Sequence, residues 1–191
     1  MSIDPLTVVK IGGGLLTETG CLDALLTEIA AASRDVALLI VPGGGPFADA
    51  VRDLDRQIGL SDDAAHWMAV LAMDQYAHLI VARLPGGALV SEPGEIEAAQ
   101  AAGRIPVLAP YRWLRGADPL PHSWEVTSDS IAAWVAGQLG ARLLVLVKPP
   151  QADGTLADPY FSRALPSFVA AHMVPADRID ALRCALRDRR V

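Results

Sequence analysis

Lysine is almost missing from this chain of 191 residues, which has only two, Lys10 and Lys148, beside 14 arginines. A genomic preference for arginine codons accounts for the ratio but not for the two positions, because both lysines lie at the ends of predicted buried strands. Basic residues are also outnumbered by acidic ones, 16 to 22, and the net charge is −6. This balance argues against a surface for nucleic acid or anionic membranes, so any bound anion must be held locally.

Cysteine and long apolar runs are scarce as well. The two cysteines, Cys21 and Cys184, lie among apolar residues in helical patterns, which predicts buried thiols rather than a disulfide or a metal pair. The four histidines lack the spacing of metal ligands, so we expect no metal site. No run reaches the roughly 18 to 20 apolar residues of a membrane helix, and the start of the chain does not resemble a signal peptide. We therefore expect a cytoplasmic protein that contacts neither nucleic acid nor membrane.

Hydrophobic residues, by contrast, make up 52% of the chain, which is enough for the core of a single domain. Runs that are rich in β-branched residues and bounded by glycine or proline indicate strands buried on both faces. They cover residues 6–11, 36–41, 105–109 and 143–147, with a weaker run at 88–90. Helical patterns separate these runs. The alternation predicts an α/β fold, a three-layer α/β/α sandwich around a mostly parallel sheet that binds ligands at the carboxyl ends of its strands.

Capping residues and glycines predict where helices begin and end. Ser61 predicts the start of a helix that reaches about residue 78, and the sequence Thr127-Ser128-Asp129 predicts the start of another. Residues 111–125 are rich in proline, tryptophan and charge without a period, which predicts a surface excursion. Residues 148–166 also predict a loop, followed by a last helix from about residue 175.

Two predicted strands end in glycine triplets, which are Gly12, Gly13 and Gly14 and then Gly43, Gly44 and Gly45. Glycines let a phosphate approach the main chain and helix N-termini offer free N–H groups, so the two turns indicate anion binding. Tight strand-to-helix turns are the plain alternative. Neither triplet is a P-loop, because no Lys-Ser or Lys-Thr follows it. The pattern Gly43-x-Gly45-x-x-Ala48 matches the dinucleotide fingerprint, but a helix stands where that fingerprint needs its next strand.

Three stretches, VVKIGGG, VPGGGPFADAVR and TSDSIAAWVAGQLGARLLVLVK, resemble the amino-acid-kinase family, which includes acetylglutamate, aspartate, uridylate and isopentenyl phosphate kinases. The resemblance covers residues 8–148. It implies a kinase that uses ATP and Mg²⁺ and phosphorylates a small-molecule acceptor. It also implies one domain over residues 1–191, with an acceptor half at about 1–110, a nucleotide half at about 111–191, and assembly into a homodimer or a larger homo-oligomer.

The family pattern also implies roles for single residues. Lys10 would contact the transferred phosphoryl group, Asp129 would orient the lysines, and Gly12, Gly13 and Gly44 would offer N–H donors along the phosphate path. Fixed positive charge and oriented donors supply most of the catalysis in phosphoryl transfer. Outside this context, Lys10 is a lysine that snorkels from a strand end, and Asp129 is a charge favoured in the first turn of a helix.

The chain departs from the family in two places. No lysine follows Lys148, whereas many members carry a late lysine for the leaving ADP, so we expect Lys148 or Arg163 to take that role. The loop KPPQADG stands where members often have an acidic strand end before Asp-Gly. These departures leave an alternative function open, that of a protein that binds oxyanions or nucleotides without catalysis, like the molybdenum storage subunits of this fold.

Within the family, the runs LSDDAAHWMAVLAMDQYAHLI, ADPYF and PADRIDAL look most like the kinases of methylofuran biosynthesis, which phosphorylate (5-(aminomethyl)furan-3-yl)methyl phosphate to its diphosphate. Kinases for an amino acid or another phosphate are alternatives. Such a furan acceptor calls for an apolar wall, a carboxylate and an anion donor. The candidates are Trp67 or Trp124 for the wall, Asp62 or Asp63 for the ammonium group, Arg52 for the acceptor phosphate, and His66 on the helix that faces the acceptor. Each residue also has a plain structural alternative in the core, at a helix start or on the surface.

Overall fold

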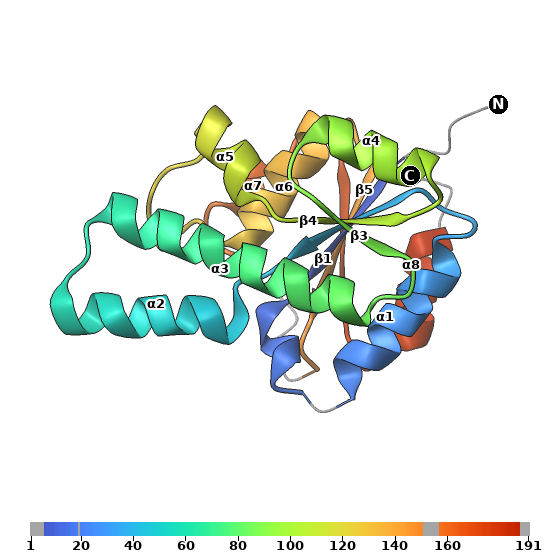
Figure 1. The fold of residues 1–191 in the computed structure, drawn as a ribbon, viewed down its shortest axis with the longest axis horizontal. Helices are drawn as coiled ribbons and strands as arrows, with labels where there is room; N and C mark the ends of the chain where they lie inside the picture. Colours follow the sequence, from blue (N-terminus) through green and yellow to red (C-terminus); the bar gives the residue numbers. More distant parts are fainter. Residues whose placement is uncertain (1–5, 19, 151–156, 188–191) are drawn as a thin grey trace.

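Six parallel strands form one central sheet in the order β3-β4-β2-β1-β5-β6, with helices packed on both faces (Figure 1). The computed structural model describes residues 6–18, 20–150 and 157–187. The strands are β1 (Thr7–Ile11), β2 (Leu38–Pro42), β3 (Gly87–Val90), β4 (Ile105–Leu108), β5 (Leu143–Lys148) and β6 (Ala170–Pro175). The predicted α/β fold is confirmed, and all five predicted strands form close to their predicted bounds.

Eight α-helices and one short 3-10 helix are present among the described residues. They are η1 (Gly13–Leu16), α1 (Cys21–Ala32), α2 (Gly45–Ile58), α3 (Asp62–Arg83), α4 (Pro93–Ala101), α5 (Tyr111–Ala117), α6 (Ser128–Gln138), α7 (Phe161–Ala164) and α8 (Ile179–Arg187). The first glycine triplet thus enters η1 rather than an α-helix. The second triplet leads directly into α2, which lies beside α3 in Figure 1.

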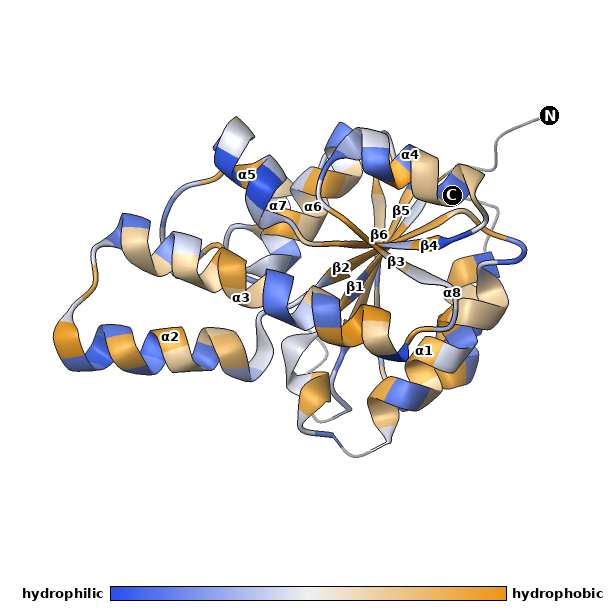
Figure 2. Ribbon diagram, in the orientation of Figure 1, coloured by the Kyte–Doolittle hydropathy of each residue, from blue (hydrophilic) through white to orange (hydrophobic). Residues whose placement is uncertain are grey.

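The core has two apolar layers because successive residues of each strand point to opposite faces of the sheet. Val9 and Ile11 of β1 pack with residues of α1 and α8, whereas Val8 packs with residues of α4, α5 and α6. The long helix α3 contributes to both layers, with its first half on one and its last half on the other. Figure 2 shows the apolar residues gathered on the strands and on helix faces that cover them.

Two predictions about the last third of the chain were wrong. Strand β6 was missed, and the last helix begins at Ile179 rather than near the strand's final residue, Pro175. β6 is an edge strand that pairs with β5 alone, and three of its six residues, Ala171, Met173 and Pro175, are exposed. A half-exposed edge strand carries no continuous apolar run, so the pattern used for the inner strands could not detect it.

Three further local predictions need correction. The excursion expected at residues 111–125 begins with α5, whose first N–H, on Tyr111, donates to Asp74 Oδ1 on α3 at 3.1 Å. The helix that begins after Ser61 extends to Arg83. The thiols expected in the core are not buried there, since Cys21 is half-buried and Cys184 is exposed. Among the described residues, no helix combines the length and the apolar character that a membrane crossing requires.

Candidate active site

The two lysines of the chain meet at one carboxylate above the carboxyl edge of the sheet. Lys10 lies near the end of β1, and Lys148 ends the neighbouring strand β5. Asp129 lies in the first turn of α6. Its Oδ1 is 2.7 Å from Lys10 Nζ, and its Oδ2 accepts a hydrogen bond from Lys148 Nζ. The structure therefore brings together all three residues that the sequence predicts as catalytic.

This cluster is buried, and burial shapes its ionisation. The side chains of Lys10 and Asp129 are 5% exposed and that of Lys148 is 16% exposed. Burial lowers the pKa of Lys10, and the ammonium group of Lys148 lowers it further, while Asp129 opposes both effects. Burial alone raises the pKa of Asp129, but Lys10 and Lys148 outweigh it and hold that pKa below its usual value. Two amines that share one carboxylate suit an incoming anion.

The two glycine turns touch each other directly. A Cβ on Gly13 would lie 2.1 Å from Gly45 N, and a Cβ on Gly43 would lie 2.6 Å from Gly13 N. Gly45 also has a positive φ of 55°, which favours glycine. Close packing of the turns therefore requires glycine at these positions whether or not an anion binds. The alternative of tight strand-to-helix turns thus explains part of the glycine pattern.

The backbone N–H groups of the two turns fall into two sets. Gly12 N donates to Val147 O and Gly43 N donates to Ile11 O, both at 2.8 Å, so these groups are engaged in the sheet. The expectation that Gly12 offers its N–H to a phosphate is therefore wrong. Within the described ranges, no backbone hydrogen bond is donated by the remaining glycines of the turns, which are Gly13, Gly14, Gly44 and Gly45. These four N–H groups are the donors that an anion can meet.

Asp158, in the segment before α7, holds the helix that carries Asp129. Its Oδ2 accepts hydrogen bonds from Thr127 N at 2.9 Å, Thr127 Oγ1 at 2.7 Å and Ser130 N at 3.0 Å. Its Oδ1 accepts from Ser130 Oγ. Sequence reasoning missed this role, and the one signal was the Asp-Pro pair within the run ADPYF. Four hydrogen bonds to one helix N-terminus fix the position of Asp129.

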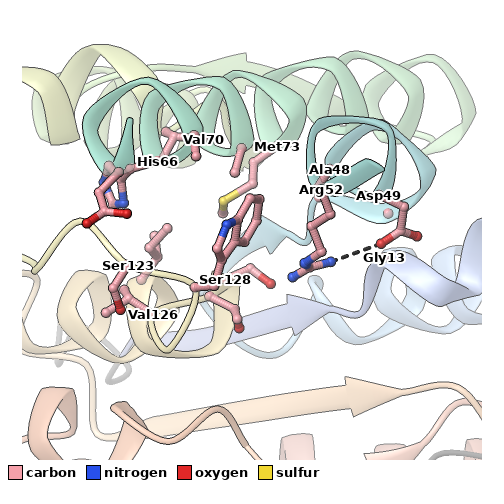
Figure 3. A pocket seen from close by; sticks show the side chains of 18 of the residues that line it. Gly13, Ala48, Asp49, Arg52, His66, Val70, Met73, Ser123, Val126 and Ser128 are labelled. Atoms are coloured by element: carbon pink, nitrogen blue, oxygen red, sulfur yellow. Dashed lines mark hydrogen bonds and ion pairs between the residues drawn. The ribbon is translucent and has the colours of Figure 1, made fainter. Parts of the chain in front are cut away.

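A cavity of about 210 Å³ lies between α2, α3 and the segment before α6. Its polar wall includes Gly13, Gly44, Arg52, Asp62 and His66, and its apolar wall includes Val70, Met73 and Ile131. Figure 3 shows His66 and Ser123 at one end of the cavity, and Arg52 and Gly13 toward the other. The cavity is therefore polar at both ends and adjoins the glycine turns.

Arg52 and Trp124 form one wall of this cavity. The guanidinium carbon of Arg52 lies 4.9 Å from the centre of the Trp124 ring, and Arg52 Nη1 donates to Asp49 Oδ1 at 2.9 Å. Of the two tryptophans predicted for an acceptor wall, Trp124 lines the cavity. Trp67 is not among the lining residues, because its buried ring packs against Tyr111 and His122 and lies under Arg115.

His66 faces the cavity as a neutral ring. Its imidazole stacks on that of His122, with ring centres 4.2 Å apart and an angle of 16°. Burial, and then the neighbouring His122, lower the pKa of His66 from 6.5 to about 4. His122 contacts Asp63 Oδ1 at 3.1 Å and Asp118 Oδ1 at 2.8 Å. Asp63 is thus engaged with His122 outside the cavity, and Asp62 is the carboxylate that lines it.

The remaining candidates either make other contacts or lie beyond the described residues. Arg163 is exposed on α7 and stacks over Tyr160 at 5.2 Å. Residues 151–154 of the KPPQADG loop lie outside the described residues. Among the residues that are described, no group of three or more His, Cys, Asp or Glu side chains is arranged to hold a metal ion. Of the two residues expected to meet the leaving ADP, Lys148 and Arg163, it is Lys148 that contacts Asp129 beside Lys10.

Comparison with known proteins gives a consistent result. A model of the amino acid kinase family matches residues 5–149. The (5-(aminomethyl)furan-3-yl)methyl phosphate kinase of Methanocaldococcus jannaschii is 30% identical over 148 residues, which cover 73% of this chain and 63% of that relative. This chain thus matches less than two thirds of the relative's length.

Solved structures of uridylate kinases share the fold. That of Archaeoglobus fulgidus has a TM-score of 0.73 at 15% identity, over 95% of each chain. The UMP kinase from Ureaplasma parvum has a TM-score of 0.70 at 15% identity, over 97% of this chain and 96% of the other. At this identity the likeness concerns the fold alone.

Proposed function

This chain belongs to the amino acid kinase family, and on that premise we propose that it transfers the γ-phosphoryl group of ATP to a small phosphomonoester. The observation that carries the proposal is the pairing of Lys10 and Lys148 with Asp129 at the ends of β1 and β5. The glycine turn that begins at Gly12 follows Lys10 along the chain by two residues. The lysines and the two glycine turns therefore stand at the ends of three neighbouring strands, β2, β1 and β5, at the carboxyl edge of the sheet.

In the proposed reaction, an oxygen of the acceptor phosphate attacks the γ-phosphorus of ATP, and the bond to the bridging oxygen of ADP breaks. Lys10 holds oxygens of the moving phosphoryl group, and Lys148 meets the charge that develops on ADP. Asp129 opposes the lowering of the Lys10 pKa by burial, and its two oxygens hold both amines in place. Gly13 and Gly44 line the adjoining cavity, and their N–H groups have no backbone acceptor among the described residues. Phosphoryl transfer needs little more from the protein than such positioning and charge.

ATP and Mg²⁺ fit this set of side chains in different ways. The amines and free N–H groups suit phosphate oxygens. No metal-holding group of side chains occurs in the part of the chain that the structure describes, which suits a Mg²⁺ ion carried mainly by ATP phosphates. When bound, Mg²⁺ supplies further neutralisation of phosphate charge.

For the acceptor we propose (5-(aminomethyl)furan-3-yl)methyl phosphate. Arg52, toward the glycine end of the cavity, suits its phosphate, and Asp62 suits its ammonium group, since Asp62 lies one helical turn before His66 at the opposite end. The cavity of about 210 Å³ is smaller than the roughly 300–1,000 Å³ of common ligand pockets, which favours a small acceptor. The name of the Methanocaldococcus jannaschii relative supports the same choice.

An ATP-consumption assay tests this function. Purified protein with ATP and Mg²⁺ receives the furan phosphate, uridylate or acetylglutamate as acceptor, and ADP release is followed. We expect turnover with the furan phosphate and little with the others. Turnover of another acceptor would contradict the substrate, and turnover of none together with tight molybdate binding would favour an oxyanion-binding protein, which the buried lysines also suit.

We further propose that the protein works in the cytoplasm as a homodimer or a larger homo-oligomer. Dependence on ATP favours the cytoplasm. Ile58 at the end of α2 is 65% exposed and Leu71 on α3 is 41% exposed, and a second copy can cover such apolar side chains. Sedimentation velocity at micromolar concentration tests the assembly, and a monomer there would contradict it.

A further inference from the structure

Residues 118–126, here called the strap, join α5 to α6 and contribute Ser123, Trp124 and Val126 to the cavity wall. Trp124 is tied to α2 through its indole. Its Nε1 donates a hydrogen bond to Asp55 Oδ2 at 2.8 Å, and the guanidinium of Arg52 lies over the same ring. The wall of the cavity is therefore built from the strap and α2 together.

Asp55 itself does not line the cavity, yet both of its carboxylate oxygens are engaged. Oδ1 accepts a hydrogen bond from Leu60 N at 2.8 Å, just beyond the end of α2, while Oδ2 accepts from Trp124. The carboxylate is thus fixed from one side and presents its second oxygen to the indole. Arg52 and Asp55 are three residues apart, so they share a face of α2.

A second anchor holds the strap on α3. His122 contacts Asp63 on α3 and stacks on His66 of the same helix. The strap therefore bridges α2 and α3, and the two anchors lie on either side of Ser123. Of the two, the Trp124 anchor includes Arg52, which lies toward the glycine end of the cavity.

We infer, resting on the kinase function proposed above, that Asp55 is a positioning residue for acceptor specificity. By fixing the Trp124 indole, Asp55 sets the flat wall on which the acceptor ring packs and the platform that aims Arg52 at the acceptor phosphate. The lysines and Asp129 stand on other elements, namely β1, β5 and α6. Loss of the Asp55 contact therefore weakens binding of the acceptor and leaves binding of ATP unchanged.

Two near-isosteric variants remove this contact from opposite sides. Asp55→Asn keeps an oxygen for Leu60 N but places an NH₂ group against the indole N–H, and Trp124→Phe keeps a ring without the N–H. We expect each to raise KM for the acceptor about tenfold, the size of effect for a lost hydrogen bond to a charged group. The double variant should show no more than the larger single effect, because both changes delete one contact.

Matched controls lie on the same elements or have the same chemistry. Asp53→Asn changes a carboxylate that pairs with Arg56 on the exposed part of α2. Trp134→Phe changes a tryptophan that packs against Trp113 and does not line the cavity. Both should leave KM for acceptor and ATP unchanged. An unchanged acceptor KM in Asp55→Asn, an equal rise in KM for ATP, or additive effects in the double variant would overturn the inference.

Calorimetric titration with the furan phosphate in the absence of ATP separates this inference from the proposed function. If the wild-type protein binds the furan phosphate without turning it over, the proposed function fails, and the dissociation constants of the variants still test Asp55. A tenfold weaker constant in Asp55→Asn then supports the inference, and an unchanged constant overturns it. Wild-type protein that neither binds nor phosphorylates this compound would overturn both.

Discussion

Asp158 holds the first turn of the helix that carries Asp129, so the carboxylate between the two lysines is itself positioned by a second carboxylate. The contact joins a residue of the segment between β5 and α7 with the start of α6. Asp158 makes no hydrogen bond or ion pair with either lysine among the described contacts; its charge raises the pKa of Lys10 slightly against the effect of burial, and its hydrogen bonds act on both lysines through the helix.

Replacing Asp158 should therefore reduce both stability and turnover. Asp158→Ala leaves the N–H groups of Thr127 and Ser130 without their acceptor, and loss of such a cap costs about 1–2 kcal/mol. Urea unfolding and kcat measure the two effects. Asp158→Asn, which keeps one acceptor oxygen, should lose less of each. A variant that is destabilised but has full kcat would show that Asp158 acts on the fold alone.

Replacing Lys10 should strongly reduce turnover while the fold stays intact. In Lys10→Ala, we expect kcat to fall by about 100- to 1,000-fold, the effect of losing one group that stabilises transition-state charge. The kcat of Lys148→Ala should fall similarly, whereas Arg163→Ala should retain activity because Arg163 stacks on Tyr160 and the ion pairs of Asp129 are with the two lysines. Circular dichroism checks folding. An active Lys10→Ala enzyme, or an inactive Arg163→Ala enzyme, would refute these roles.

The ring of His66 should make stability depend on pH. Its folded pKa of about 4 lies below the ordinary value of 6.5, so the unfolded chain binds more protons between these values. The contribution of His66 is complete above pH 6.5 and is lost as pH falls toward 4. Urea unfolding at pH 7 and pH 5 should therefore show a smaller loss of stability at pH 5 in His66→Asn than in the wild type. His78→Asn, an exposed change on the same helix, should match the wild type.

The contact between the glycine turns predicts a steric effect at Gly13. Gly13→Ala places a Cβ 2.1 Å from Gly45 N, and such overpacking costs about 1–3 kcal/mol. We expect a lower Tm by calorimetry and a loss of kcat. Gly116→Ala on α5 is the control, because nothing lies within 4 Å of the added Cβ. Equal Tm values for the two variants would contradict tight packing of the turns.

The sequence predicted the parts of this molecule that local pattern determines. The strand that contains Lys10 is rich in β-branched residues and is bounded by turn residues, and its burial on both faces follows from that pattern. Asp129 follows Thr127, whose hydroxyl accepts from Asp129 N at 3.4 Å at the predicted start of α6. The order of the family motifs then predicted that Asp129 orients Lys10.

Other features depend on contacts between distant segments, which one sequence does not display. In the sequence, Asp158 does not differ from other carboxylates in predicted loops. Its role follows only from its contacts with Thr127. The sequence offered Trp67 and Trp124 equally for the cavity wall, because both are tryptophans near charged residues. Only their packing separates them, since Trp67 packs against Tyr111 and Trp124 lies under Arg52 beside the cavity. Strand β6 was missed because tertiary pairing with β5, rather than its own apolar pattern, makes it a strand.

The direct contact of Gly13 with Gly45 has a consequence for how such a protein can change over generations. Main-chain atoms set the spacing of the two turns, so no side chain mediates it. Mutations around the cavity, at Arg52, Asp62 or Trp124, can then alter which molecule fits without displacing the turns. The spacing of the turns and the chemistry of the cavity wall are therefore set by different groups, main-chain atoms for the first and side chains for the second.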